Sequence, residues 1–228
     1  PQHRSGNSHI IGSIAVDLCQ LDATSSYILV AVHAAVPHAV TTVKLDSKTE
    51  HCIADALGEA VLTLEQFWGI PAVLRIHSDR ESGLVSQRPL WTSRAIRITT
   101  TLGDDPQSNG AAERYIGILG QKARRRIAHV KDPVTRAFLW PWAMRHAADS
   151  YSFDEYAKLG LRPALANSAP RSHLPFLTAV VAHATCAKHR ADENRARQAV
   201  FLVVSRDVPG GVIVLLTSEI KQDNTVTA

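Results

Sequence analysis

The sequence predicts an α/β domain built on a mixed sheet, followed by a small β-rich region. Three observations favour this fold class: three successive apolar β-branched segments, a segment of helical period after them, and then strands that alternate with helices. The chain has 228 residues, of which 45% are hydrophobic and 20% charged, and this composition excludes a largely disordered chain. The length suits one domain of about 150 residues and a smaller unit.

The first three strands are expected at residues 10–18, 27–32 and 40–45. Each segment is apolar and rich in β-branched residues, as in a buried strand. Short, turn-rich links join the segments, so consecutive strands are expected to pair with each other. These segments therefore predict an antiparallel meander.

The period changes after the meander. Apolar residues recur every three to four positions between residues 47 and 68, which predicts a helix with one buried face. The residues of this face are Ile53, Leu57, Val61, Leu64 and Trp68. A fourth strand is expected at 72–77, a short helix at 86–95 and a fifth strand at 96–101.

A loop, two helices and a β-rich tail complete the predicted order. The loop of residues 102–110 is rich in turn formers, and a long helix is expected at 111–130. Pro133 suits the first turn of a further helix that runs to about Tyr151. Short strands are expected at 179–181, 200–204 and 212–216, with a hairpin turn at 209–211 between the last two.

These elements give three expected parts. Residues 8–155 form the core, residues 156–172 form a proline-containing linker, and residues 173–228 form a small β-rich, SH3-like tail. The chain does not begin with methionine, and we expect it to be a piece of a longer polyprotein.

Several classes of protein are not expected from this sequence. No apolar run reaches the roughly 18–20 residues that span a bilayer, so we expect no membrane partner. The three cysteines are odd in number and far apart, and no CxxC motif occurs. A disulfide framework is therefore disfavoured, and an intracellular, reducing compartment is expected.

Charge is distributed unevenly along the chain. The net charge is +4, but residues 113–145 carry eight basic and two acidic side chains, and residues 1–112 carry eight basic and eleven acidic ones. The tail from 156 carries nine basic and five acidic side chains. We expect a polyanion to bind along the long helix and the tail rather than over the first strands. A solvated helix face is the alternative.

Three acidic residues stand at unusual places in the predicted elements. Asp17 lies inside an apolar strand, Asp79 follows the fourth strand, and Glu113 lies in the first turn of the long helix. If the first and fourth strands are neighbours, the three carboxylates converge, and we expect their oxygens to lie within about 4–8 Å of one another. Such carboxylates need a counter-charge, and hard oxygen ligands select Mg²⁺ or Mn²⁺.

The surrounding motifs resemble those of retroviral and retrotransposon integrases. Residues 76–80 (Ile-His-Ser-Asp-Arg) resemble the second-aspartate motif of that family. Residues 105–114 (Asp-Pro-Gln-Ser-Asn-Gly-Ala-Ala-Glu-Arg) resemble its third-acid motif, and residues 14–18 (Ile-Ala-Val-Asp-Leu) its first-aspartate strand. The tail resembles the region that follows the core in copia-type retrotransposon polyproteins.

The resemblance implies a ribonuclease-H-like fold and a DNA-joining activity. Asp17, Asp79 and Glu113 would be the catalytic residues and would hold two Mg²⁺ or Mn²⁺ ions for DNA end processing and strand transfer. DNA and further copies of the chain would be its partners, as a dimer at least, and the nucleus would be its location.

Further residues are expected to contact DNA. Gln107, Ser108 and Asn109 offer neutral hydrogen-bonding groups in the loop before Glu113, with simple turn formation as the alternative. Lys122 and Arg126 are four residues apart on the long helix and so share a face that could meet phosphates.

Two alternatives to an integrase stay open. A nuclease or cut-and-paste transposase on the same fold would use the same three acids. A catalytically impaired or domesticated nucleic-acid-binding protein is favoured by one departure: Arg80, Glu81 and Ser82 follow Asp79, where the family usually has a glycine within two positions.

Overall fold

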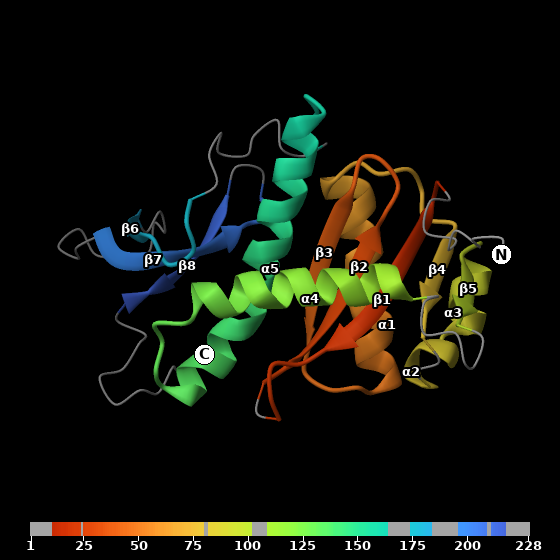
Figure 1. The fold of residues 1–228 in the computed structure, drawn as a ribbon, viewed down its shortest axis with the longest axis horizontal. Coiled ribbons are helices and arrows are strands. Elements are labelled where there is room, and N and C mark those ends of the chain that lie inside the picture. The colour runs from red at the N-terminus through yellow and green to blue at the C-terminus, as the bar shows by residue number, and fades with distance from the viewer. Residues whose placement is uncertain are drawn as a thin grey trace, which may run out of the picture.

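A mixed five-stranded sheet with helices on both faces forms the larger part of the molecule (Figure 1). The structure is a computed structural model, and it describes residues 11–23, 25–79, 82–101, 109–163, 174–183, 196–208 and 211–217. Strands follow the order β3-β2-β1-β4-β5, so the first strand of the chain lies at the centre of the sheet. The predicted α/β class with a mixed sheet is confirmed.

The sheet combines an antiparallel and a parallel half. The strands β1 (Ser13–Cys19), β2 (Tyr27–His33) and β3 (Ala39–Leu45) form the predicted antiparallel meander. The strands β4 (Arg75–Ser78) and β5 (Arg97–Thr100) run parallel to β1. β4 begins three residues later than predicted, although Leu74 already bonds to the carbonyl of Gly12 and to the N–H of Arg97.

Helices cover the sheet on both sides. One side carries α1 (Glu50–Leu62), which continues as a π-helix, η2 (Thr63–Phe67), and the short α2 (Ser82–Val85) and α3 (Arg88–Ser93). The other side carries α4 (Gly110–Arg126) and α5 (Pro133–Lys158). The short helix expected at 86–95 is α3, and α2 is a further short helix before it that the sequence did not predict.

The helix α5 runs further than its sequence suggests. It continues to Lys158, seven residues beyond the predicted end, so the first three residues of the predicted linker are helical. Tyr156 explains the extension, because its side chain is buried and its hydroxyl donates a hydrogen bond of 2.7 Å to the carbonyl of Trp68. Pro141 lies inside the helix without ending it.

The core has two layers, one on each face of the sheet. Alternate residues of the strands point to opposite faces: Ile14 and Val16 of β1 pack with α1, whereas Val30 of β2 packs with α4 and α5. Leu57 and Trp68 are fully buried in the first layer, as predicted for their helix face. In the part of the chain that the structure describes, no helix is long and apolar enough to cross a membrane.

The C-terminal strands form a second, three-stranded sheet beside α5 (Figure 1). Its antiparallel strands are β6 (Ala179–His183), β7 (Ala196–Val204) and β8 (Val212–Leu216). The side chains of β7 enter both layers of the core, with Phe201 in one and Val203 in the other. The tail thus shares the core of the larger sheet. Residues 209–210 of the predicted hairpin turn lie outside the described residues, and the predicted boundaries 8–155, 156–172 and 173–228 stay predictions.

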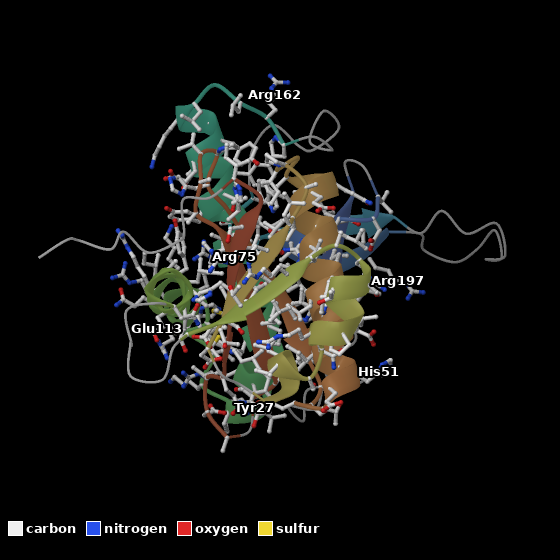
Figure 2. All side chains as sticks on the ribbon, turned by 90° about the vertical axis from the view of Figure 1, so that its right-hand side faces the viewer. Tyr27, His51, Arg75, Glu113, Arg162 and Arg197 are labelled. Atoms are coloured by element: carbon white, nitrogen blue, oxygen red, sulfur yellow. The ribbon has the colours of Figure 1, made fainter. Side chains whose placement is uncertain are left out.

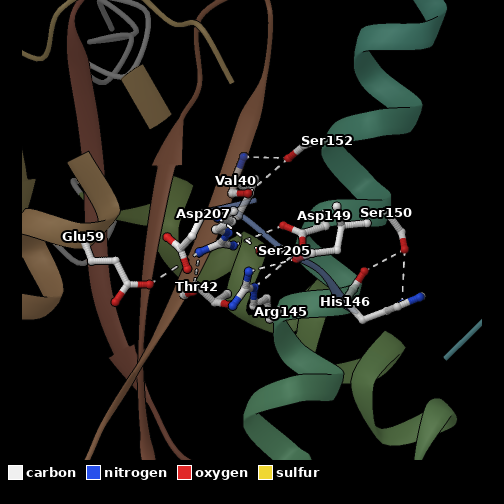
Figure 3. Close-up of polar contacts among 12 residues, drawn as sticks. Val40, Thr42, Glu59, Arg145, His146, Asp149, Ser150, Ser152, Ser205 and Asp207 are labelled. Atoms are coloured by element: carbon white, nitrogen blue, oxygen red, sulfur yellow. Dashed lines mark hydrogen bonds and ion pairs between the residues drawn. The ribbon is translucent and has the colours of Figure 1, made fainter. Parts of the chain in front are cut away.

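A buried ion network joins the tail to the core (Figure 3). Arg206, which follows β7, donates hydrogen bonds to Asp149 of α5 at 3.1 Å and to the carbonyl of Thr42 in β3 at 3.3 Å. The side chain of Arg206 is 7% exposed and that of Asp149 is 2% exposed. Arg145 of α5 completes the network by donating to the carbonyl of Val204. Arg206 of the tail therefore contacts both the five-stranded sheet and α5.

We predict that Arg206→Ala destabilises the protein by about 3–5 kcal/mol, because it leaves the buried Asp149 without its nearest cation. Denaturant unfolding followed by tryptophan fluorescence measures the change. Lys158→Ala is the control, because its ion pair with Glu155 lies at the surface and should leave the midpoint unchanged. Equal midpoints for Arg206→Ala and the unaltered protein would contradict the assigned role of the network.

Candidate functional site

Two of the three predicted carboxylates belong to the carboxyl ends of neighbouring strands, which we call the catalytic edge of the sheet. β1 and β4 are parallel neighbours in the register Ala15 with His77 and Val16 with Ser78. The next residues in this register are Asp17 and Asp79. Adjacent strands are about 4.8 Å apart. The two aspartates are therefore neighbours at the carboxyl ends of these two parallel strands.

The two aspartates belong to the face of the sheet that α4 covers. Ile14, Val16 and Ile76 point into the α1 layer of the core, so alternation places Asp17 on the opposite face. The same alternation, extended by one residue past β4, places Asp79 there too. Both residues are half-buried.

The first turn of α4 is fixed against the same edge by one hydrogen bond. The side-chain amide of Asn109 donates to the carbonyl of Val16 at 3.3 Å, directly before Asp17. Asn109 is 2% exposed and its own carbonyl accepts the backbone N–H of Glu113. Glu113 therefore lies one helical turn from the contact with β1, on the surface of α4 (Figure 2).

Glu113 is exposed in the first turn of α4. Among the described residues, no set of three or more His, Cys, Asp and Glu side chains is gathered closely enough to hold a metal ion. The elements that carry the three carboxylates meet, and the expected spacing of their oxygens stays a prediction. The catalytic and metal-binding roles of Asp17, Asp79 and Glu113 stay predictions.

Cys19 and His77 are side chains close to the two aspartates. Burial, with the charge of Asp17 as a second cause, raises the pKa of the Cys19 thiol to about 12, and this thiol lies two residues along the same face of β1. On β4, the imidazole of His77 makes a 2.9 Å hydrogen bond between its Nδ1 and Oγ1 of Thr99. The Cys19 thiol therefore carries no charge at neutral pH.

The residues predicted to contact DNA have mixed outcomes. Gln107 and Ser108 lie outside the described residues. The interpretation of Asn109 as a DNA contact is corrected, because its side chain is buried and bonded to Val16; it positions α4 instead. The sequence offered the signal of an Asn before a helix, but only the fold supplies its partner in β1.

Lys122 and Arg126 share a face of α4, as predicted, but that face is directed toward α5. The ammonium of Lys122 lies 5.3 Å from the ring centre of Tyr151. The guanidinium of Arg126 donates to Nδ1 of His146 at 2.9 Å, and burial lowers its pKa. Their contact with DNA stays a prediction, and His146 and Tyr151 are partners that the sequence reasoning missed.

We predict that Asn109→Ala lowers stability by about 1–2 kcal/mol, the cost of a lost buried hydrogen bond. Hydrogen exchange should quicken in the first turn of α4 and leave the last turn unchanged. Ser93→Ala removes an exposed hydrogen bond from side chain to backbone and is the control. Unchanged exchange in the first turn would show that Asn109 does not hold this helix in place.

The thiols should differ in reactivity. Hydrogen bonds from Ser47 and Thr49 lower the pKa of Cys52, whereas Cys19 stays protonated until its raised pKa of about 12. At about pH 8.5, near the pKa of an ordinary thiol, iodoacetamide should therefore alkylate Cys52 and spare Cys19. Peptide mapping by mass spectrometry separates the two sites, and equal labelling would contradict the assigned environment of Cys19.

The comparisons with known proteins agree with this fold. No protein-family model matches the chain, and no curated protein matches its sequence. A chain in the structure of the simian T-cell lymphotropic virus intasome in complex with PP2A regulatory subunit B56 gamma is similar, with a TM-score of 0.50 and 18% identity over 92% of this chain and 79% of that one.

Two further solved structures match more distantly. The catalytic core domain of BIV integrase is 18% identical over 66% of this chain and 99% of its own, with a TM-score of 0.45. The HTLV-2 integrase catalytic core domain in complex with magnesium is 19% identical over 60% of this chain and 86% of its own, with a TM-score of 0.43. The intasome chain, which spans nearly all of this one, carries the conclusion: the protein has the ribonuclease-H-like fold that the resemblance implied.

Proposed function

We propose that this protein is an integrase-type polynucleotidyl transferase that processes and joins DNA ends. One observation carries the proposal: Asp17 and Asp79 are the residues that come directly after the paired Val16 and Ser78 of two parallel strands, and Asn109 holds the first turn of α4 to the carbonyl of Val16. The likeness to an intasome chain in fold supports it, as do the three motifs of the sequence. DNA is the proposed substrate, and a multimer in the nucleus is the proposed setting.

The donor set suits a hard divalent cation. Asp17 and Asp79 would present carboxylate oxygens, the ligands that Mg²⁺ and Mn²⁺ prefer. When bound, such ions supply a more acidic water and neutralise charge on the phosphate under attack. The two aspartates would hold an ion between the strands, and Glu113, from the first turn of α4, would complete a second position.

The polypeptide itself then has two tasks. It must hold the carboxylates at fixed places, and the parallel pairing of β1 with β4 does this for Asp17 and Asp79. It must also bring the third carboxylate to the same edge, and the hydrogen bond of Asn109 to Val16 sets where α4 begins. No covalent bond between protein and DNA is required.

A non-catalytic DNA-binding protein is the second candidate. It is favoured by the run Arg80-Glu81-Ser82 after Asp79, where related sequences usually have a glycine within two positions. This candidate shares the fold and DNA binding but not the cleavage of phosphodiester bonds. The same experiment separates the two candidates.

The test uses a pool of labelled duplexes with randomised terminal sequences, because the cognate ends are unknown, and either Mg²⁺ or Mn²⁺. The unaltered protein should nick or join a subset of these ends. Asp17→Asn, Asp79→Asn and Glu113→Gln keep the shape of each side chain but remove its charge. Each variant should lose several kcal/mol of transition-state stabilisation, which is a roughly 100-fold or larger fall in the reaction rate. The affinity for DNA should stay nearly unchanged, because it comes mainly from phosphate contacts.

Asp46→Asn is the matched control, because Asp46 lies after β3, is 84% exposed and pairs with Lys44. It should retain full activity. Full activity in Asp79→Asn would remove that residue from the site and contradict the proposal. DNA binding without any metal-dependent product in the unaltered protein would favour the non-catalytic candidate.

A further inference from the structure

Two arginines lie directly opposite each other on β4 and β5. Arg75 and Arg97 are partners in the parallel register of these strands. Their neighbours Ile76 and Ile98 point into the α1 layer of the core, so both arginines belong to the opposite face. This is the face that carries Asp79 and Thr99. Figure 2 looks onto the β5 edge and labels Arg75 together with Glu113.

An open cavity of about 470 Å³ lies beside Arg97, at the edge strand β5. Arg88 and Thr92 of α3 line it together with Arg97, and Thr99 and Thr100 add hydroxyl groups. Arg88, Thr92 and Arg97 are all exposed. The cavity therefore offers two guanidinium groups, which bind phosphate oxygens. The hydroxyls of Thr92 and Thr99 donate to the carbonyls of Arg88 and Ile76.

The arginines have no acidic partner in the part of the chain that the structure describes. No ion pair there involves Arg75, Arg88 or Arg97. Between Glu81 and Asp104 the sequence contains no acidic residue. Arg75 donates instead to Oγ1 of Thr99 at 2.9 Å, and burial and the charge of Arg97 lower its pKa.

Like charges that face each other across a sheet are destabilising. A bound polyanion would turn this repulsion into attraction, and the Arg75–Arg97 pair would then favour binding.

The surface is continuous with the proposed catalytic edge. His77 and Arg75 lie two and four residues before Asp79 on one face of β4, which is about 7 and 13 Å along the strand. The longer span corresponds to the rise of roughly four base pairs along the axis of a duplex, at 3.4 Å each. A strand whose phosphate lay at Asp79 could thus reach the arginines without a bend.

We propose that Arg75, Arg88 and Arg97 form a phosphate-contacting surface that holds the DNA strand leading away from the catalytic edge, across β4 and β5. This inference rests on the proposed function, because the direction of the strand is set by Asp17 and Asp79. The net negative charge of residues 1–112 predicted that a polyanion would not bind over this part of the chain. The inference changes that expectation, because these residues include a local basic surface.

The test measures affinity for a labelled duplex across a series of salt concentrations. Arg88→Gln/Arg97→Gln removes two exposed charges and leaves the hydrogen bond of Arg75 in place. The slope of log affinity against log salt should fall by about 2, close to one unit for each lost phosphate contact. Arg94→Gln is the matched control, since Arg94 is exposed in the same segment but lines a different cavity, beside Asp55 and Glu59.

A reduced slope in the double variant with an unchanged slope in Arg94→Gln supports the inference. An unchanged slope in the double variant, or an equal fall in the control, overturns it. Binding is measured with Asp79→Asn as background, so that failure of catalysis does not alter the result. If the slope falls while Asp79→Asn stays active, the proposed function fails and the DNA-binding surface remains.

Discussion

The parallel pairing of β1 with β4 is the constraint on which the rest of the structure depends. It places the first strand of the chain at the centre of the sheet and makes Asp17 and Asp79 neighbours although 61 residues separate them. It also sets the position of α4, because Asn109 bonds to the carbonyl of Val16 on β1. A shift of one residue in the register of either strand would turn the aspartate of that strand to the α1 face, away from α4.

The tail is held to this core by charge as well as by apolar contacts. Arg206 crosses from the end of β7 to Asp149 and to the carbonyl of Thr42, while Phe201 and Val203 enter the two core layers. Buried ion pairs add little net stability but are costly to break. The network therefore fixes the orientation of the small sheet, and with it the position of the tail relative to α5.

The strands and long helices could be predicted from the sequence because their apolar periods are strong, as at Leu57 and Trp68. Features that depend on tertiary partners could not. The last turn of α5 is stabilised by the bond of Tyr156 to Trp68, which no local pattern reveals. Asn109 reads as a loop residue until β1 is beside it, and the Arg75–Arg97 pair exists only once the register of β4 and β5 is known. The carboxylates were identified from their motifs, whereas the partners of Lys122 and Arg126 on α5 were not.

The central claim is that Asp17 and Asp79 together bind a divalent cation. A crystal structure of the protein with Mn²⁺, read by its anomalous scattering, tests it most directly. We expect Mn²⁺ at about 2.0–2.3 Å from carboxylate oxygens of both aspartates, as for hard cations in oxygen sites. Mn²⁺ bound at other residues, with both aspartates uncoordinated at saturating metal, would contradict the account.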